Sequence, residues 1–172
     1  MSPGEFLVRQ NKWDIRFLRL AREVSTWSKD SSTQVGAVIT DKENRVVSLG
    51  YNGLPRAIPD SDDILLDRTE KYETIIHAEM NALLFTTRPP AGCTIYTYPL
   101  PPCSRCASVI IQAGIRTVVS VVPSPEILER WKDSLARATN LYSTALTSLR
   151  LIAEDKLSRP DTVTKPGDGA GK

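Results

Sequence analysis

Residues 94–122 read TIYTYPLPPCSRCASVIIQAGIRTVVSVV, a stretch that predicts a strand, a helix and a second strand in succession. Thr94 to Tyr98 is rich in β-branched and aromatic residues, which favour a short strand. After two prolines, a helix is expected from about Cys103 to Ala113, with Gly114 as its C-terminal cap. Arg116 to Val122 is a continuous branched run, typical of a strand that is buried on both faces.

The flanking segments continue this alternation of helix and strand. Apolar residues at helical spacing predict a first helix, and two apolar runs around a polar turn predict a hairpin. The other expected elements are a helix at 13–27, strands at 34–40 and 46–51, a helix at 75–86, a helix at 124–145 and a strand at 146–152. This order predicts a three-layer α/β domain with a mixed sheet of about five strands.

The chain of 172 residues is expected to form one domain between a lead and a tail. Residues 1–12 lack periodicity and should be a flexible lead, and residues 13–152 should form the domain. Residues 153–172 are dominated by Pro, Gly, Asp and Lys, which predicts a disordered tail. Residues 52–73 are interpreted as a long polar loop, and loops of that length tend to be functional.

The composition limits the possible partners. The net charge is +2, with 22 basic and 20 acidic residues. Because the charges are well mixed, no clustered basic face indicates a long nucleic-acid partner. No apolar run reaches the roughly 20 residues of a membrane span, and no secretory leader precedes Trp13, so a cytoplasmic protein (host cytoplasm for a viral source) is expected. Three cysteines favour a metal site over a disulfide framework.

Three residues have the character of metal ligands. His77 is the one histidine of the chain, and Cys103 and Cys106 are separated by two residues, which lets both thiolates reach one ion. Pro102 precedes this pair where a helix should begin, and a helix N-terminus lowers thiol pKa values. One nitrogen and two sulfur ligands leave the fourth position of a tetrahedral zinc open, as in catalytic sites. The cysteines could instead be buried apolar residues.

Glu79 is the candidate for proton transfer. A zinc ion lowers the pKa of a bound water from about 16 towards 7, and a partner must then move protons to the departing amine. On a helix Glu79 would point about 200° away from His77, which suits a shuttle rather than a fourth ligand. H-x-E followed by P-C-x-x-C is the signature of zinc nucleobase deaminases. Alternatively, Glu79 could simply stabilise the helix dipole.

From about Trp13 to Ile152 the sequence resembles the cytidine deaminase superfamily, and within it the deoxycytidylate (dCMP) deaminases. Four stretches carry the likeness: Trp27–Ala37, Gly50–Pro55, Lys71–Ala82 and Pro102–Ile115. The Gly-Tyr-Asn-Gly-x-Pro run and the Lys71-Tyr72 pair are typical of dCMP deaminases rather than of cytidine or tRNA adenosine deaminases.

The resemblance implies a set of roles for individual residues. The zinc ligands would be His77, Cys103 and Cys106, and Glu79 would be the proton shuttle. Asn52 would bind the sugar or the base, and the segment Val35 to Ala37 would wall the base pocket. The remaining substrate contacts implied are the Ala78 backbone, Lys29 for phosphate and Tyr98 for base stacking, although the segment before Pro102 is longer than usual.

The resemblance also implies an activity and partners. The reaction would be dCMP plus water giving dUMP plus ammonia, in a hexameric or dimeric homo-oligomer. The regulators would be dCTP and dTTP, with Mg²⁺ accompanying the allosteric nucleotide. Alternative substrates are dCTP, a 5-modified dCMP or, against the charge pattern, a nucleic acid. A catalytically silent zinc module is a further alternative.

Several of these residues also have simpler interpretations. Asn52-Gly53 could be turn chemistry, and Lys29 could be a solvated charge. Cys93 is interpreted as structural. The competing candidates for phosphate binding are Arg22, Arg56 and Arg68. The core of the first helix is expected to contain Trp13, Phe17 and Trp27. The charged residues of 126–137 are expected to lie on a solvated face or at a subunit contact.

Overall fold

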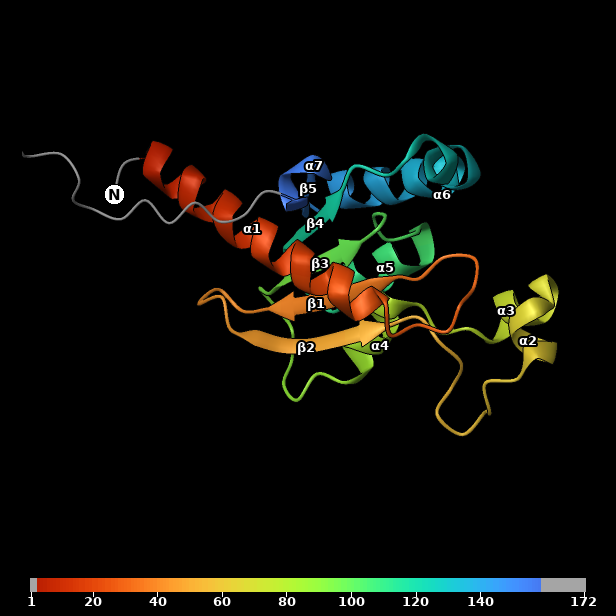
Figure 1. Cartoon of the computed structure of the whole chain (residues 1–172). Coiled ribbons are helices and arrows are strands. Elements are labelled where there is room, and N and C mark those ends of the chain that lie inside the picture. The colour runs from red at the N-terminus through yellow and green to blue at the C-terminus, as the bar shows by residue number, and fades with distance from the viewer. Residues whose placement is uncertain (1–2, 159–172) are drawn as a thin grey trace, which may run out of the picture.

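The computed structural model describes residues 3–158. A hairpin and three short helices follow the first helix, and from Thr94 onward strands and helices alternate (Figure 1). The elements are α1 (Pro3–Ser25), β1 (Gly36–Thr40), β2 (Val46–Tyr51), α2 (Asp62–Leu66), α3 (Arg68–Thr74), α4 (Ala78–Leu84), β3 (Thr94–Tyr98), α5 (Ser104–Gln112), β4 (Thr117–Val121), α6 (Pro125–Thr144), β5 (Ser148–Ile152) and α7 (Asp155–Ser158).

The strands form one mixed sheet in the order β2-β1-β3-β4-β5. Strand β1 pairs antiparallel with both β2 and β3, whereas β3, β4 and β5 run parallel. The parallel strands are joined by the crossover helices α5 and α6, as parallel pairing requires. The predicted mixed sheet of five strands is therefore confirmed.

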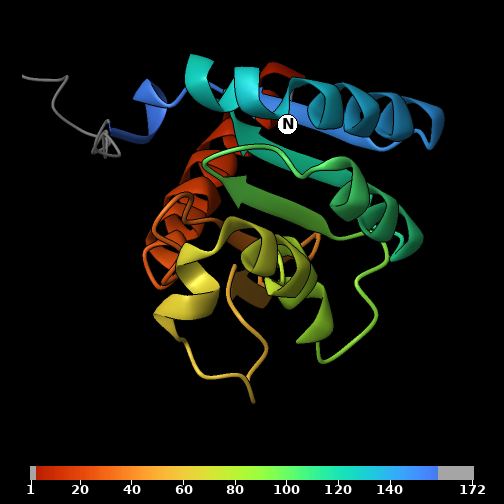
Figure 2. The same ribbon diagram turned by 90° about the vertical axis from the view of Figure 1, so that its right-hand side faces the viewer.

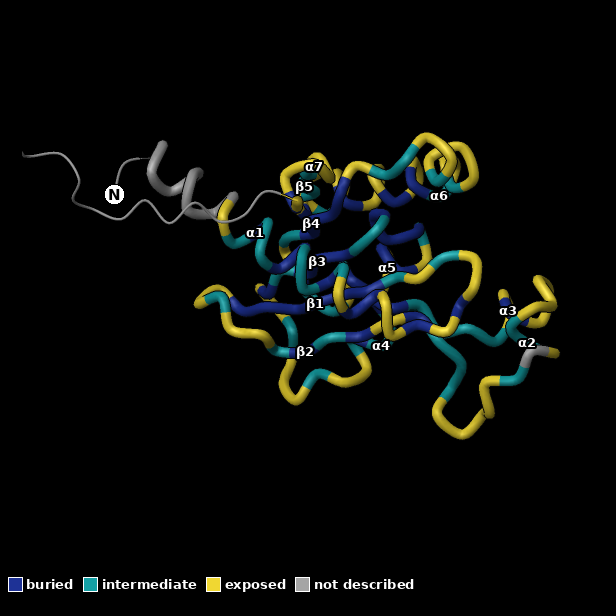
Figure 3. Tube along the Cα trace, viewed as in Figure 1, coloured by how far each residue is buried: buried dark blue, intermediate teal, exposed yellow. Residues whose placement is uncertain are grey.

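Helices cover both faces of the sheet and make three layers. Helix α1 packs on one face, and α4, α5 and α6 pack on the other (Figure 2). Strand β1 is buried along its whole length, so its side chains serve two cores (Figure 3). Val38 packs with Phe17 and Leu18 of α1, while Ala37 and Ile39 pack towards α4 and α5. This alternation follows from the two-residue period of a strand.

Two glycines set the spacing of the layers. A Cβ on Gly36 would lie 2.1 Å from the Ala21 carbonyl oxygen of α1. A Cβ on Gly50 would lie 2.4 Å from the Ala82 backbone nitrogen and 2.6 Å from the Ala78 carbonyl oxygen of α4. The absence of a side chain thus lets β2 approach α4 closely, which fixes the position of the residues just before that helix.

Several expectations for the connections are wrong. Helix α1 begins at Pro3, earlier than the expected Trp13, so residues 3–12 are helical rather than an irregular lead. Proline is well tolerated in a first helical turn, and no later proline interrupts this segment. The segment 52–73 contains α2 and most of α3, because Asp67 caps α3 by accepting hydrogen bonds from the Thr69 and Glu70 backbone nitrogens.

Two further expectations also need correction. Trp27 follows the end of α1 and is 48% exposed, in edge contact with Tyr51, so it is not a core residue. The expected tail begins with the short helix α7, and residues 159–172 lie outside the described residues. The division into lead, domain and tail otherwise stays a prediction. No described helix is both long enough and apolar enough to cross a bilayer.

Candidate metal centre and pocket

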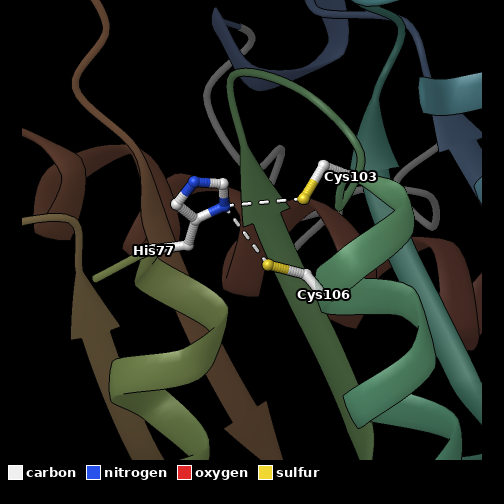
Figure 4. A group of neighbouring side chains, drawn as sticks. All are labelled: His77, Cys103 and Cys106. Carbon is white, nitrogen blue, oxygen red and sulfur yellow. Dashed lines mark hydrogen bonds between the residues drawn. The ribbon is translucent and has the colours of Figure 1, made fainter. Parts of the chain in front are cut away.

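Two helix N-termini bring the three predicted ligands together. His77 is the N-cap residue of α4, Cys103 is the N-cap residue of α5, and Cys106 lies in the first turn of α5. The residue before His77 is fixed by a bridge in which Gly53 and Ile76 exchange backbone hydrogen bonds of 3.1 and 2.9 Å. Figure 4 shows the imidazole facing both sulfurs.

The geometry of this group fits zinc. The Nδ1 atom of His77 lies 3.5 Å from Sγ of Cys103 and 3.3 Å from Sγ of Cys106. All three ligand atoms lie within 4.8 Å of one another. A tetrahedral ion with bonds of about 2.0 Å to nitrogen and about 2.3 Å to sulfur would separate N from S by about 3.5 Å. The three residues therefore offer the donor set and the spacing of a catalytic zinc site with one open position.

The electrostatics of the cluster also favour a cation. The hydrogen bond from the Cys106 thiol lowers the pKa of Cys103 to about 4, and His77 lowers it further against the effect of burial. The same contact with Cys103, together with burial, raises the pKa of Cys106. One thiolate is thus stabilised by the neighbouring thiol, and a divalent cation between them would stabilise both as thiolates. The pKa of His77 is raised, first of all by its contact with Cys103.

Glu79 lies in the first turn of α4 and is buried. It lines the same pocket as His77 and Ala78. Burial raises the pKa of Glu79, while the charge on His77 acts in the opposite direction. The expectation that both residues lie on the helix is wrong for His77, whose extended backbone (φ −66°, ψ 152°) places it before the first turn. Glu79 nevertheless lines the pocket beside the ligand cluster.

The pocket beside the cluster is lined by residues from four parts of the chain. They are Asp30, Ser32, Thr33 and Val35 after α1; Asn52, Tyr72, Ile75, His77, Ala78 and Glu79 around α3 and α4; Leu100, Pro101 and Cys103 before α5; and Arg130 and Trp131 on α6. Of the predicted substrate contacts, Asn52, Val35 and Ala78 line this pocket. Its walls are largely apolar, as expected for a site that takes a planar base.

Three other predicted contacts do not line this pocket. Ala37 is fully buried in the core beneath α4. Lys29 points to solvent, 69% exposed, and forms an ion pair of 2.8 Å with Asp60. Tyr98 packs against the core under α1 and donates a hydrogen bond of 2.6 Å to Glu154, because strand alternation puts it on the same face as Tyr96.

A buried polar network behind the pocket was missed by the sequence patterns. Nζ of Lys71 lies 3.1 Å from Oδ1 of Asp30 and also donates to the Ser32 hydroxyl. Asp30 accepts hydrogen bonds of 2.8 Å from both the backbone nitrogen and the hydroxyl of Ser32. The Asn52 amide donates to Asp30 at 3.2 Å and accepts from the Val35 nitrogen at 2.7 Å. The Asn52 side chain thus holds the pocket wall together. The members of this network lie in stretches that resemble the family, but no pattern in the sequence indicates that they pair with one another.

Two residues of α6 were also missed. Arg130 is one of the charges expected on a solvated face or at a subunit contact, and the sequence predicts no role for Trp131, yet both line the pocket. Arg130 donates a hydrogen bond to the Thr33 hydroxyl, which ties α6 to the loop after α1. Nε1 of Trp131 is buried and has no hydrogen-bond partner within residues 3–158. No local motif marks these residues, because the fold alone brings α6 to the pocket.

Comparison with known proteins identifies relatives of this chain. Residues 11–122 match the family described as the cytidine and deoxycytidylate deaminase zinc-binding region. The chain is 44% identical over 135 residues to an uncharacterized deaminase from the luxG 3' region of Aliivibrio fischeri, covering 78% of this chain and 90% of that protein. It is 40% identical over 116 residues to the human deoxycytidylate deaminase, and this match covers 63% of this chain and 64% of the human protein.

A solved structure shares the fold. The dCMP deaminase of cyanophage S-TIM5, in complex with dCMP and dUMP, superposes with a TM-score of 0.63 at 19% identity. The match covers 88% of this chain and 99% of the phage protein. This likeness confirms the predicted α/β deaminase-like fold.

Proposed function

The chain belongs to the cytidine and deoxycytidylate deaminase family, and we propose that it is a zinc-dependent enzyme that converts dCMP and water to dUMP and ammonia. The observation that carries this proposal is the cluster of His77, Cys103 and Cys106 at two helix N-termini, with Glu79 in the same pocket. Further support comes from the relatives, several of which bear the name deoxycytidylate deaminase.

In this proposal His77, Cys103 and Cys106 hold the zinc ion. When bound, the ion supplies Lewis-acid chemistry that makes water a nucleophile near neutral pH. Glu79 moves the protons: its carboxylate accepts a proton as water adds to C4 of the base, and it then delivers a proton to the departing amine. Burial raises the pKa of Glu79, which favours the protonated form that must donate a proton to the departing amine.

The pocket walls orient the base. We assign Val35 and Ala78 to contacts with the base, because they line the pocket beside His77 and Glu79. Asn52 keeps the wall in place, and its backbone carbonyl accepts a hydrogen bond of 2.7 Å from the buried Ser28 hydroxyl. Apolar walls would also exclude bulk water from the reacting atoms.

Ammonia release from dCMP by the zinc-loaded protein tests the proposal. Glu79→Gln should bind zinc as the wild type does and lose about 10²- to 10⁴-fold in kcat, the usual contribution of a general acid–base group. Turnover by Glu79→Gln at the wild-type rate would refute the role of Glu79. Wild-type turnover of cytidine or RNA, with none of dCMP, would refute the substrate.

The finer assignments rest on the family resemblance. We propose a homo-oligomer, hexameric or dimeric, in the cytoplasm, regulated by dCTP and dTTP with Mg²⁺ on the triphosphate. Ammonia release from dCMP, 5-modified dCMP, dCTP and single-stranded DNA separates the alternative substrates. Light scattering with and without each effector measures the mass of the oligomer.

A further inference from the structure

A second hollow adjoins the pocket and is strongly basic. It is lined by Arg68 of α3, Arg105 of α5 and Arg130 of α6, and it shares Tyr72, His77, Cys103, Arg130 and Trp131 with the pocket. Ser104 and Ser134 complete the lining, and none of these lining residues is an aspartate or a glutamate. We call these residues the basic hollow. Three guanidinium groups without a carboxylate in the same lining create a site for an anion.

The arginines of the basic hollow keep donors for a ligand, although one guanidinium nitrogen of Arg130 already donates to the Thr33 hydroxyl. Within the described part of the chain, Arg68, Arg105 and Arg130 form no ion pair. Arg68 lies over the Tyr72 ring at 5.4 Å, and Arg130 lies over the Trp131 ring at 5.6 Å. Stacking on an aromatic ring orients a guanidinium without occupying its hydrogen-bond donors. Two elements, α3 and α6, thus present oriented arginines beside the opening of the pocket.

The other cations proposed from the sequence are engaged elsewhere. Lys29 pairs with Asp60. Arg56 lies over the Phe85 ring at 4.3 Å and lines neither the pocket nor the basic hollow. Arg22 lines a third hollow, which contains Glu126 and which Arg130 also borders, but Arg22 itself lines neither the pocket nor the basic hollow. Behind the pocket, the buried cation Lys71 is paired with the lining residue Asp30. Of those earlier candidates, Arg68 alone lines the basic hollow.

We propose that the basic hollow binds the 5'-phosphate of the substrate, with Arg130 and Arg68 as its main ligands and Arg105 adding positive charge. This inference rests on the proposed function, because it places the base in the pocket beside His77 and the phosphate one sugar away at the opening. A phosphate monoester carries a charge of about −1.5 to −2 at neutral pH, which two arginines match with paired hydrogen bonds. The enzyme therefore selects nucleotides over nucleosides.

The test compares dCMP with deoxycytidine in the zinc-loaded enzyme. Arg130→Met and Arg68→Met keep an apolar stem and remove the charge, and Arg130→Lys keeps the charge without the planar fork. The ratio of kcat/KM for dCMP to that for deoxycytidine should fall about 10- to 100-fold in each Met variant, the usual loss for a charge-assisted hydrogen bond. Arg130→Lys should lose less. Arg56→Met, outside the hollow, is the matched control and should keep the wild-type ratio.

A binding measurement separates this inference from the proposed function. Calorimetry should show that wild type binds dUMP more tightly than deoxyuridine, and that Arg130→Met abolishes most of this difference, whether or not turnover is detected. If dCMP is deaminated but both Met variants keep the wild-type ratio and the dUMP preference, the basic hollow is not the phosphate site. If wild type binds dUMP through Arg130 but deaminates no cytosine nucleotide, the proposed function is wrong and the phosphate site stands.

Discussion

Replacement of Lys71 by methionine would test the buried network behind the pocket. Both partners of the Lys71–Asp30 pair are nearly inaccessible, with side-chain exposures of 7% and 8% and an N–O distance of 3.1 Å. Methionine keeps an unbranched side chain of similar length and removes only the ammonium group. The variant therefore leaves a buried carboxylate without its cation.

The expected loss follows from what remains around Asp30. Removing one partner of a buried ion pair costs about 3–5 kcal/mol of unfolding free energy. Asp30 would keep its hydrogen bonds from Ser32 and Asn52, which continue to stabilise the carboxylate. The lower end, about 3 kcal/mol, is therefore expected. For a domain of this size that corresponds to a fall in Tm of about 6–12 °C.

The pH dependence gives a second readout. Burial alone would raise the pKa of Asp30, but the hydrogen bonds from Ser32 and the pair with Lys71 lower it below its ordinary 3.8. A carboxyl with a lowered pKa in the folded state stabilises the protein above its unfolded pKa and loses that contribution as the pH falls through the folded value. The gap in stability between wild type and Lys71→Met should thus be constant above about pH 5 and narrow below pH 3.8.

Urea denaturation of the zinc-loaded proteins, followed by circular dichroism, measures the effect. Lys29→Met is the matched control, because it removes an exposed lysine that is also paired with an aspartate and should leave the midpoint unchanged. The double variant Asp30→Asn with Lys71→Met should recover part of the loss, since no unpaired charge remains. A loss for Lys71→Met no larger than for Lys29→Met would refute the account of this network.

Three shorter predictions concern packing and the metal. Gly50→Ala should lower the free energy of unfolding by about 3 kcal/mol, because the added Cβ forces β2 away from α4. Gly53→Ala should change it little, because its added Cβ would have no atom nearer than 3.9 Å. Thermal unfolding of the two variants measures the difference. Tyr142→Phe should leave stability unchanged or raise it by about 1 kcal/mol in urea denaturation, because this buried hydroxyl has no partner in the described chain. Cys106→Ser should bind zinc far more weakly than the wild type, which metal analysis after dialysis would measure. If the variant kept as much zinc as the wild type, the assignment of Cys106 as a ligand would be wrong.

The metal cluster could be predicted from sequence because its ligands are defined by local features. Two cysteines at a fixed spacing after a proline, at the start of a helix, identify one half of the site. A single histidine in the chain leaves little choice for the other half. The strands could also be predicted, because the branched run that forms β4 and the alternation of residues that forms the hairpin are local patterns.

The substrate contacts were harder to predict, because they depend on which side chains the fold brings together. Lys29 and Lys71 are both cations in stretches typical of the family, but only the fold shows that one pairs in solvent with Asp60 and the other in the interior with Asp30. Tyr98, predicted to stack on the base, packs on the α1 side of the sheet instead, because a single aromatic residue at a strand end does not reveal which layer it meets. Arg130 contacts the loop after α1 across nearly one hundred positions of sequence, and no local pattern encodes such a contact.

In the proposed phosphate site, Arg130 lies on α6 and Arg68 lies on the segment between β2 and α4, so neither arginine is a ligand of the metal centre. The segment between β2 and α4 is fixed near His77 by the Gly53–Ile76 bridge and near α3 by buried Lys71. Between these two attachments it presents Tyr72 to the pocket and Arg68 to the basic hollow. The ligand residues, in contrast, lie at the starts of α4 and α5, which pack on the sheet. If the phosphate site is as proposed, changes at Arg68 should alter which nucleotide is bound while the zinc ligands and Glu79 keep their positions.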